Sequence, residues 1–181
     1  MIGVATFQSI EGQNLNFAIP SEKITSLILT EENKISITEE LFVQEEKEKK
    51  DSDYAYEAAD KAFYFIDKRE YEKALPYLEI AIKADISLLK TWAYFEIGYC
   101  YDELGNYTKA IEAYKQTIRI YPDYAKAHYN LGVAYGELGF YEDAIEAYKQ
   151  AIRADPDYAS AHSNLGLAYF LIGDKNSALN E

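Results

Sequence analysis

The chain is poor in residues that build covalent or metal-centred frameworks. Its 181 residues include one cysteine, Cys100, and two histidines, His128 and His162. A single cysteine excludes an internal disulfide, and we expect neither a metal site nor a cofactor. No basic group is placed to lower the pKa of Cys100, so we expect a buried, inert thiol. A metal would need ligands beyond the two histidines, which are therefore expected to have a packing role.

Long apolar runs are missing as well. The longest cover only a few residues, such as 27–29, whereas a membrane-spanning helix needs about 20. We therefore expect no insertion into a membrane. The first four residues, Met1-Ile2-Gly3-Val4, have neither a basic start nor an apolar stretch behind them. We expect no signal peptide in this sequence, and nothing in it indicates a compartment.

Positive charge is in short supply. Lysine and arginine number 18 against 31 aspartates and glutamates, which gives a formal net charge of −13. This argues against nucleic-acid binding, in which basic patches supply most of the affinity. It favours neutral or basic partners. Tyrosine, with 18 residues, is abundant, and most tyrosines are expected in the core because they recur at regular positions.

The sequence repeats itself. The segment 109–116 recurs in nearly the same form at 143–150, and the segment 127–132 recurs at 161–166; both offsets are 34. A weaker copy, 71–75, precedes 107–111 by 36. A fixed period of this length indicates stacked structural units. We divide the array into 55–90, 91–124, 125–158 and a partial unit, 159–181, whose second helix would stop at Glu181.

Each unit has the pattern of two helices, here called A and B. In 125–158 the first helix is expected to end at Gly139, a residue free to adopt positive φ. The second is expected to begin near Tyr141 and to end at Asp155-Pro156, because proline lacks an N–H group. Two apolar stripes follow helical spacing; they are Leu131, Ala134, Tyr135 and Leu138, then Ala144, Ile145, Tyr148, Ala151 and Ile152. Small Gly132 and Ala144 are expected to let the helices approach closely.

This pattern resembles the tetratricopeptide repeat (TPR) family over 55–181. In the third unit the matching residues are His128, Leu131-Gly132, Tyr135, Ala144, Tyr148, Ala151 and Pro156, and in the second they are Tyr94, Ile97-Gly98, Tyr101, Ala110, Tyr114, Thr117 and Pro122. The first unit departs most, with Lys61, Ala62, Arg69 and Ile86 at the Leu, Gly, turn-Gly and Pro positions. The resemblance implies an all-α helix-turn-helix solenoid of three full units and a part, a TPR domain over 54–181.

Residues 1–29 do not share the period. Residues 3–8 and 15–19 have the pattern of short strands around a turn, and Ser21 is placed to cap a helix over 21–29. Gly3-Val4-Ala5-Thr6 and the run from Gly12 to Pro20 resemble the C-terminal end of trypsin-like serine proteases of the bacterial HtrA kind. The resemblance implies a remnant of a protease domain, whose catalytic residues would all lie upstream, in a periplasmic or secreted parent. Residues 30–53, dense in Glu and Lys, are expected to form a charged linker. Two alternatives stay open: its few apolar residues, 35, 37 and 41–43, form a short strand or helix against the first repeat, or residues 44–53 extend the first repeat helix.

The TPR resemblance places certain helix A residues on a concave, ligand-binding surface. We define the candidate face as ten of these residues: Phe63, Trp92, Phe95, Glu96, Tyr99, Glu103, Lys126, Tyr129, Asn130 and Asn164. Asp102 and Glu137 are expected beside them. Exposed aromatic side chains indicate a binding surface, unless the linker or the closing helix of the same chain covers them.

One TPR specialisation, the carboxylate clamp for a peptide C-terminus, is incomplete. Lys126, Asn130 and Asn164 are present, but the family's other clamp positions hold Ala59, Phe63, Phe95 and Tyr99. The resemblance therefore argues against a chaperone-tail clamp. The two asparagines are expected to hydrogen-bond an extended peptide backbone.

We predict a non-catalytic scaffold that binds a protein or peptide, an extended segment with apolar and basic side chains, and recruits it for a larger protein. No nucleophile–base pair is evident in this chain, so no peptidase activity is expected. The alternative is an inactive C-terminal fragment of a trypsin-like serine endopeptidase fused to repeats. A third possibility is weak self-association through the partial C-terminal unit.

Overall fold

The computed structural model describes residues 4–8, 14–18 and 31–178, and the chain divides into two compact units, Met1–Lys47 and Glu48–Glu181. In the first unit, strands β1 (Val4–Gln8) and β2 (Asn14–Ala18) pair antiparallel, with Ala5 opposite Phe17 and Phe7 opposite Leu15. Both predicted strands are therefore confirmed. The predicted helix over 21–29 lies outside the described residues.

Helix α2 (Glu31–Asp67) covers the segment expected as a charged linker from Glu31 onward, in line with the alternative that residues 44–53 extend the first repeat helix. Glutamate and lysine resist burial, but they are also good helix formers. Further along α2, Glu57 and Lys61 pair one turn apart at 2.8 Å. The last part of α2, which bears the buried Ala55, Ala59 and Ala62, serves as helix A of the first repeat.

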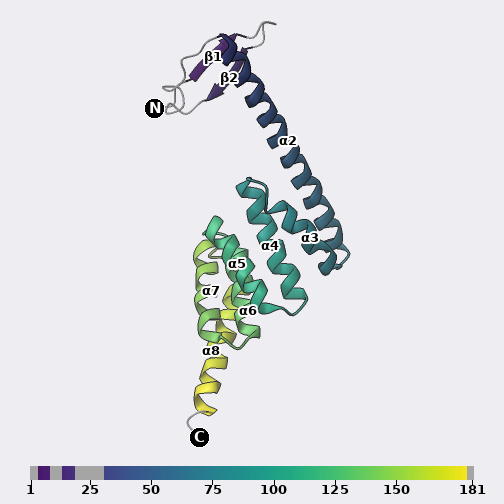
Figure 1. The fold of residues 1–181 in the computed structure, drawn as a ribbon. Helices are drawn as coiled ribbons and strands as arrows, with labels where there is room; N and C mark the ends of the chain where they lie inside the picture. Colours follow the sequence, from purple (N-terminus) through teal and green to yellow (C-terminus); the bar gives the residue numbers. More distant parts are fainter. Residues whose placement is uncertain (1–3, 9–13, 19–30, 179–181) are drawn as a thin grey trace. The chain divides into compact units, whose positions relative to one another are not determined.

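The remaining helices alternate as A and B members of the repeats (Figure 1). The second member of the first repeat is α3 (Tyr71–Ala81), and the next two repeats are the pairs α4 (Ser87–Glu103) with α5 (Tyr107–Ile120) and α6 (Ala125–Glu137) with α7 (Tyr141–Ala154). Each helix from α3 to α8 (Ala159–Ala178) contacts the next one along the chain. The predicted helix-turn-helix solenoid is confirmed.

The turns between A and B helices require positive φ. Gly105 and Gly139 adopt φ of 72° and 74°, as predicted for Gly139. Arg69, which replaces glycine in the first repeat, is forced to a φ of 57°. For an L-residue with a Cβ atom, this conformation carries steric strain. The first repeat therefore keeps the turn of its neighbours at a higher conformational cost.

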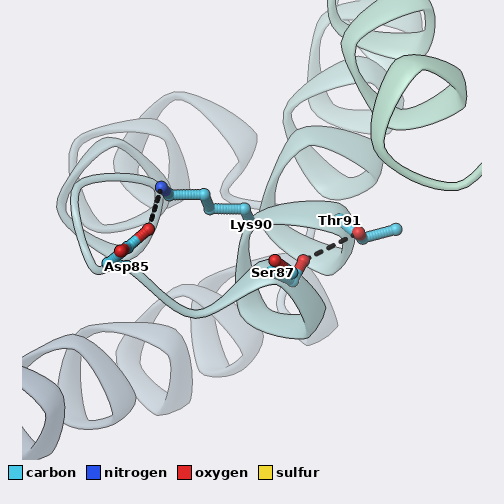
Figure 2. Close-up of polar contacts among 4 residues, drawn as sticks. All are labelled: Asp85, Ser87, Lys90 and Thr91. Carbon is cyan, nitrogen blue, oxygen red and sulfur yellow. Dashed lines mark hydrogen bonds and ion pairs between the residues drawn. The ribbon is translucent and has the colours of Figure 1, made fainter. Parts of the chain in front are cut away.

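The connections from B helices to the next A helix differ in the same way. In the later repeats His128 Nε2 lies 2.7 Å from the Pro122 carbonyl oxygen, and His162 Nε2 lies 2.9 Å from that of Pro156. Each histidine thus ties its helix to the preceding turn, which gives the predicted structural role a specific contact. The α3–α4 connection lacks proline and is instead bridged by an exposed Asp85–Lys90 ion pair of 3.1 Å (Figure 2).

A glycine–tyrosine contact fixes the distance between the A and B helices. The ring of Tyr114 lies so close to Gly98 that an added Cβ atom would be 2.5 Å from it, and Tyr148 lies in the same way on Gly132, at 2.6 Å. Both tyrosines are buried. Tyr148 therefore packs on helix A of its own unit and also joins a core cluster with Ala168 of the next unit.

Helix α8 corrects the expected fourth unit. A second helix was expected to begin within 159–181, but α8 continues without a turn through Gly173 to Ala178. Gly166, the counterpart of Gly98 and Gly132, has no atom within 4 Å of the place where a Cβ would stand. Where no described side chain packs on this surface, a single helix that keeps its backbone hydrogen bonds is the favoured arrangement.

Candidate functional site

The candidate face is distributed over the A helices, and α6 contacts both α4 and α8. Phe63 lies exposed on α2, Lys126 is exposed on α6, and Glu103 is exposed at the end of α4. The other seven residues are partly buried; they are Trp92, Phe95, Glu96, Tyr99, Tyr129, Asn130 and Asn164. The aromatic members on α4 and α6 are thus less exposed than the sequence pattern indicated.

Two aromatic sets, at equivalent positions of successive repeats, explain this burial. Phe95 lies with its ring centroid 5.8 Å from Tyr114 and 5.1 Å from Tyr124. Its counterpart Tyr129 lies 5.9 Å from Tyr148 and 5.0 Å from Tyr158. In each set, one partner comes from the B helix of the same unit and the other from the residue just before the next A helix, so the repeat array itself provides cover. These partner tyrosines were assigned only to the core by sequence reasoning.

A third aromatic contact links the first two repeats. Tyr99 and Tyr71 pack edge to face at 5.8 Å, and the Tyr71 hydroxyl donates a hydrogen bond to Glu103 Oε2 at 3.1 Å. Burial and these partners raise the pKa of Tyr71 well above its ordinary value. Trp92 is packed against the same core cluster. Three predicted residues, Trp92, Tyr99 and Glu103, therefore belong to one continuous packed surface.

The two asparagines occupy equivalent positions in different surroundings. Asn164 Nδ2 donates a hydrogen bond to the Tyr129 hydroxyl at 3.2 Å, which ties α8 to α6. For Asn130, the residue equivalent to Tyr129 is Phe95, which has no hydroxyl to accept such a bond. An amide side chain has two N–H donors and a carbonyl acceptor. Both asparagines therefore retain hydrogen-bonding capacity toward a ligand.

Carboxylates gather between the second and third repeats. The pKa of Asp102 is raised to about 6, first by burial and then by repulsion from Glu103 and Glu137. Burial also raises the pKa of Glu96, and the Lys126 ammonium opposes that change. Lys126 is thus the cation that acts on Glu96, while the charged groups acting on Asp102 are both negative. The surroundings of Asp102 favour a positive charge.

Two polar atoms at this place are buried without a hydrogen-bond partner: Asp102 Oδ1 and the Tyr114 hydroxyl. Tyr114 is fully buried, whereas Asp102 as a whole is only partly buried. Burial, and then the Asp102 charge, raises the pKa of Tyr114. The Asn130 side chain near the Tyr114 hydroxyl lowers that pKa, but its contact falls short of a hydrogen bond. Such orphaned atoms are uncommon in folded proteins.

A hollow of about 390 Å³ continues the face between α6, α7 and α8. Its lining combines apolar side chains, including Val133, Leu167 and Leu171, with the polar groups of Glu137, Tyr141, Tyr148 and Asn164. Burial raises the pKa of Tyr148 to about 12. A hollow of this kind suits an apolar side chain with a polar backbone beside it.

Cys100 and Asn106 have structural surroundings and show no sign of a reactive site. Burial raises the pKa of Cys100 to about 12, as expected for an inert thiol. The Asn106 side chain caps α5 by accepting a hydrogen bond from the Lys109 N–H group. In the described part of the chain, no three or more His, Cys, Asp or Glu side chains are grouped so as to hold a metal ion. The described helices include none that is long and apolar enough to cross a membrane.

Comparison with known proteins supports the repeat assignment. Residues 98–139 and 137–173 match the family model described as TPR repeat. No curated protein matches the chain. The match does not reach residues 1–29, so their resemblance to a protease stays a prediction.

Solved structures with the same fold include TPR domains. The Sgt2 TPR domain from Aspergillus fumigatus has a TM-score of 0.62 at 22% identity and covers 68% of this chain and 82% of its own. The second TPR domain of human RPAP3, solved with the HSP70 peptide SGPTIEEVD, has a TM-score of 0.58 at 21% identity; the alignment covers 67% of this chain and 98% of that domain. MamA has a TM-score of 0.64 at 23% identity, and the alignment covers 85% of this chain and 91% of MamA. The repeat region of this chain therefore has the TPR solenoid fold.

Proposed function

We propose that the chain is a non-catalytic TPR module whose candidate face binds an extended segment with apolar and basic side chains. The observation that carries this proposal is the meeting of aromatic rings, two asparagines and a carboxylate cluster on adjacent A helices. The rings provide apolar area, and Asn130 and Asn164 provide backbone partners one repeat apart. The hollow beside Asn164 provides room for an apolar side chain.

The charge of the face distinguishes this proposal from the ligand seen in a structural relative. The human RPAP3 domain was solved with an HSP70 peptide that ends in the acidic sequence EEVD. Here Glu96, Asp102 and Glu103 lie on α4 and Glu137 lies on α6, and Lys126 is a cation that acts on Glu96. Like charges across an interface are costly, so an acidic peptide tail is disfavoured and a basic segment is favoured.

A peptide array followed by titration of the best hits tests the proposal. Trp92 is the single tryptophan of the chain, so its fluorescence reports directly on binding at the face. We expect basic and apolar peptides to bind and Phe95→Ala to weaken them about tenfold or more, because interface aromatics often contribute about 2 kcal/mol each. The control is Phe140→Ala, a half-exposed phenylalanine outside the candidate face. Preference for acidic peptides, or equal affinities for both variants, would reject the proposal.

Self-association is a second candidate, favoured by one observation. The side chains of Leu167, Tyr169 and Phe170 on α8 are exposed by 55%, 51% and 63%. Exposed apolar groups on neighbouring turns of a helix favour contact with another surface. Mass measurement over a range of concentrations tests this, and a constant monomer mass up to millimolar concentration would reject it.

A further inference from the structure

We propose that the junction of α4, α5 and α6 is a recognition site for one basic side chain, a lysine ammonium or an arginine guanidinium, held by Asp102. The inference rests on the proposed function and names the ligand group that the carboxylate cluster selects. It starts from the two orphaned atoms, Asp102 Oδ1 and the Tyr114 hydroxyl. A buried acceptor without a partner costs stability, so its presence calls for a reason.

The fold itself does not require a carboxylate at position 102. The equivalent positions of the next two units hold Gly136 and Phe170. The glycine–tyrosine contact that sets the helix spacing is the same in both complete units, at 2.5 Å for Gly98 and 2.6 Å for Gly132. Asp102 therefore differs from its counterparts in the other units and is not needed for the glycine–tyrosine contact that sets the helix spacing.

The electrostatic surroundings select a cation. Asp102 is repelled by Glu103 of its own helix and by Glu137 of α6. Tyr107, on α5, also lies near Glu137 and Asp102. A positive charge placed here is attracted by three carboxylates at once and removes their mutual repulsion.

The hydrogen-bonding groups select a donor with several N–H bonds. The Asp102 carboxylate and the Tyr114 phenol oxygen can both accept, and Asp102 Oδ1 and the Tyr114 hydroxyl each lack a partner in the structure. An ammonium or guanidinium group offers several N–H donors and no acceptor. Asp102 is only partly buried, so rotation of its side chain can admit the incoming group. The ring of Phe95, 5.8 Å from that of Tyr114, provides apolar area for the methylene stem of that side chain.

The experiment is a double-mutant cycle between protein and peptide, on the full chain. A peptide selected from the array is compared with two kinds of variant. Lysine is replaced by norleucine, which removes the charge together with the N–H donors. Arginine is replaced by citrulline, which removes the charge and keeps a planar group with N–H donors. Asp102→Asn is the test variant. Glu142→Gln, which removes one exposed charge outside the candidate face, is the matched control. Affinity is measured by Trp92 fluorescence and by calorimetry, and thermal unfolding verifies that each variant folds.

We expect charge removal from one peptide position to lower affinity about tenfold or more for the natural chain and for Glu142→Gln, but less than threefold for Asp102→Asn. An equal loss in all three proteins would overturn the inference while leaving peptide binding intact. A complete lack of peptide binding would reject the proposed function and this inference together. Tight binding of free butylamine, or of Ca²⁺, in the absence of peptide would show that the site binds isolated cations. That result would also overturn the inference that Asp102 recognises a basic side chain of a peptide.

Discussion

Replacement of Gly132 by alanine tests whether the glycine–tyrosine contact sets the helix spacing. In a helix interior, alanine normally stabilises by about 0.5–1 kcal/mol over glycine. At position 132 the new Cβ atom would stand 2.6 Å from Tyr148 Cε1 and 2.7 Å from Cδ1. Tyr148 is buried and packs on Tyr129, so its ring cannot move away cheaply. Overpacking of this kind costs about 1–3 kcal/mol.

We therefore expect Gly132→Ala to lower the free energy of unfolding by about 1–2 kcal/mol, the overpacking cost less the gain in helix propensity. Two glycines serve as controls. A Cβ at Gly136 would be 3.9 Å from the Tyr148 hydroxyl, an ordinary contact, and a Cβ at Gly166 would meet nothing within 4 Å. Alanine at either position should stabilise by about 0.5–1 kcal/mol.

Urea unfolding followed by circular dichroism measures all three variants. Because Tyr148 is the cause of the clash, combining Gly132→Ala with Tyr148→Ala should cost less than the sum of the two single changes. Additive costs, or a Gly132→Ala variant as stable as Gly136→Ala, would refute the assignment of Tyr148 as the spacer. The reasoning about Gly98 and Tyr114 would then fail as well.

Three further predictions concern single contacts. Arg69→Gly should stabilise by about 1 kcal/mol in urea unfolding, because glycine adopts the φ of 57° without steric strain; an unchanged or lower stability would contradict this. Asp102→Asn should stabilise by about 1 kcal/mol at pH 7.5, after allowance for solvent screening. The pKa of Asp102 rises from 3.8 to about 6 on folding, so the ionised carboxylate destabilises the folded state increasingly as pH rises from about 4 to 6. The stability advantage of Asp102→Asn should therefore vanish near pH 4. An advantage that does not change with pH would refute ionisation of Asp102 as its cause. His128→Ala should cost about 1 kcal/mol through loss of the contact to the Pro122 carbonyl, whereas His128→Gln, whose amide can replace the donor, should cost less.

The repeat architecture was predictable from the amino-acid sequence, because the signals for it are local. A helix ends where glycine adopts positive φ or where proline removes an N–H group, and both events depend on a few neighbouring residues. Gly139, the start of α7 at Tyr141 and its end before Asp155 were therefore predictable. The two strands were predictable from alternation alone. The positions of the candidate face followed from the period once the TPR resemblance was recognised.

Local signals were misleading where two structures suit the same residues. The Glu- and Lys-rich segment after Glu31 has the composition of a solvated linker and also of a solvated helix, and it forms the helix α2. Gly173 has the residue type of a turn, but no B helix packs on the described surface around Gly166, and α8 continues. A turn forms only when the helix after it gains enough buried area to offset the lost helical hydrogen bonds.

The depth at which each side chain is buried, and the groups that it meets, emerged only from the stacking of the repeats. Phe95 is covered by Tyr114 of α5, and Tyr129 is covered by Tyr158, which stands just before α8, so aromatic area that the period places on a surface becomes partly core. The Asn164–Tyr129 hydrogen bond joins α8 to α6. The surroundings of the orphaned Asp102 oxygen include Tyr114 from the next helix and Glu137 from the next repeat. Burial and charge are properties of stacked units, and no single period of the sequence contains them.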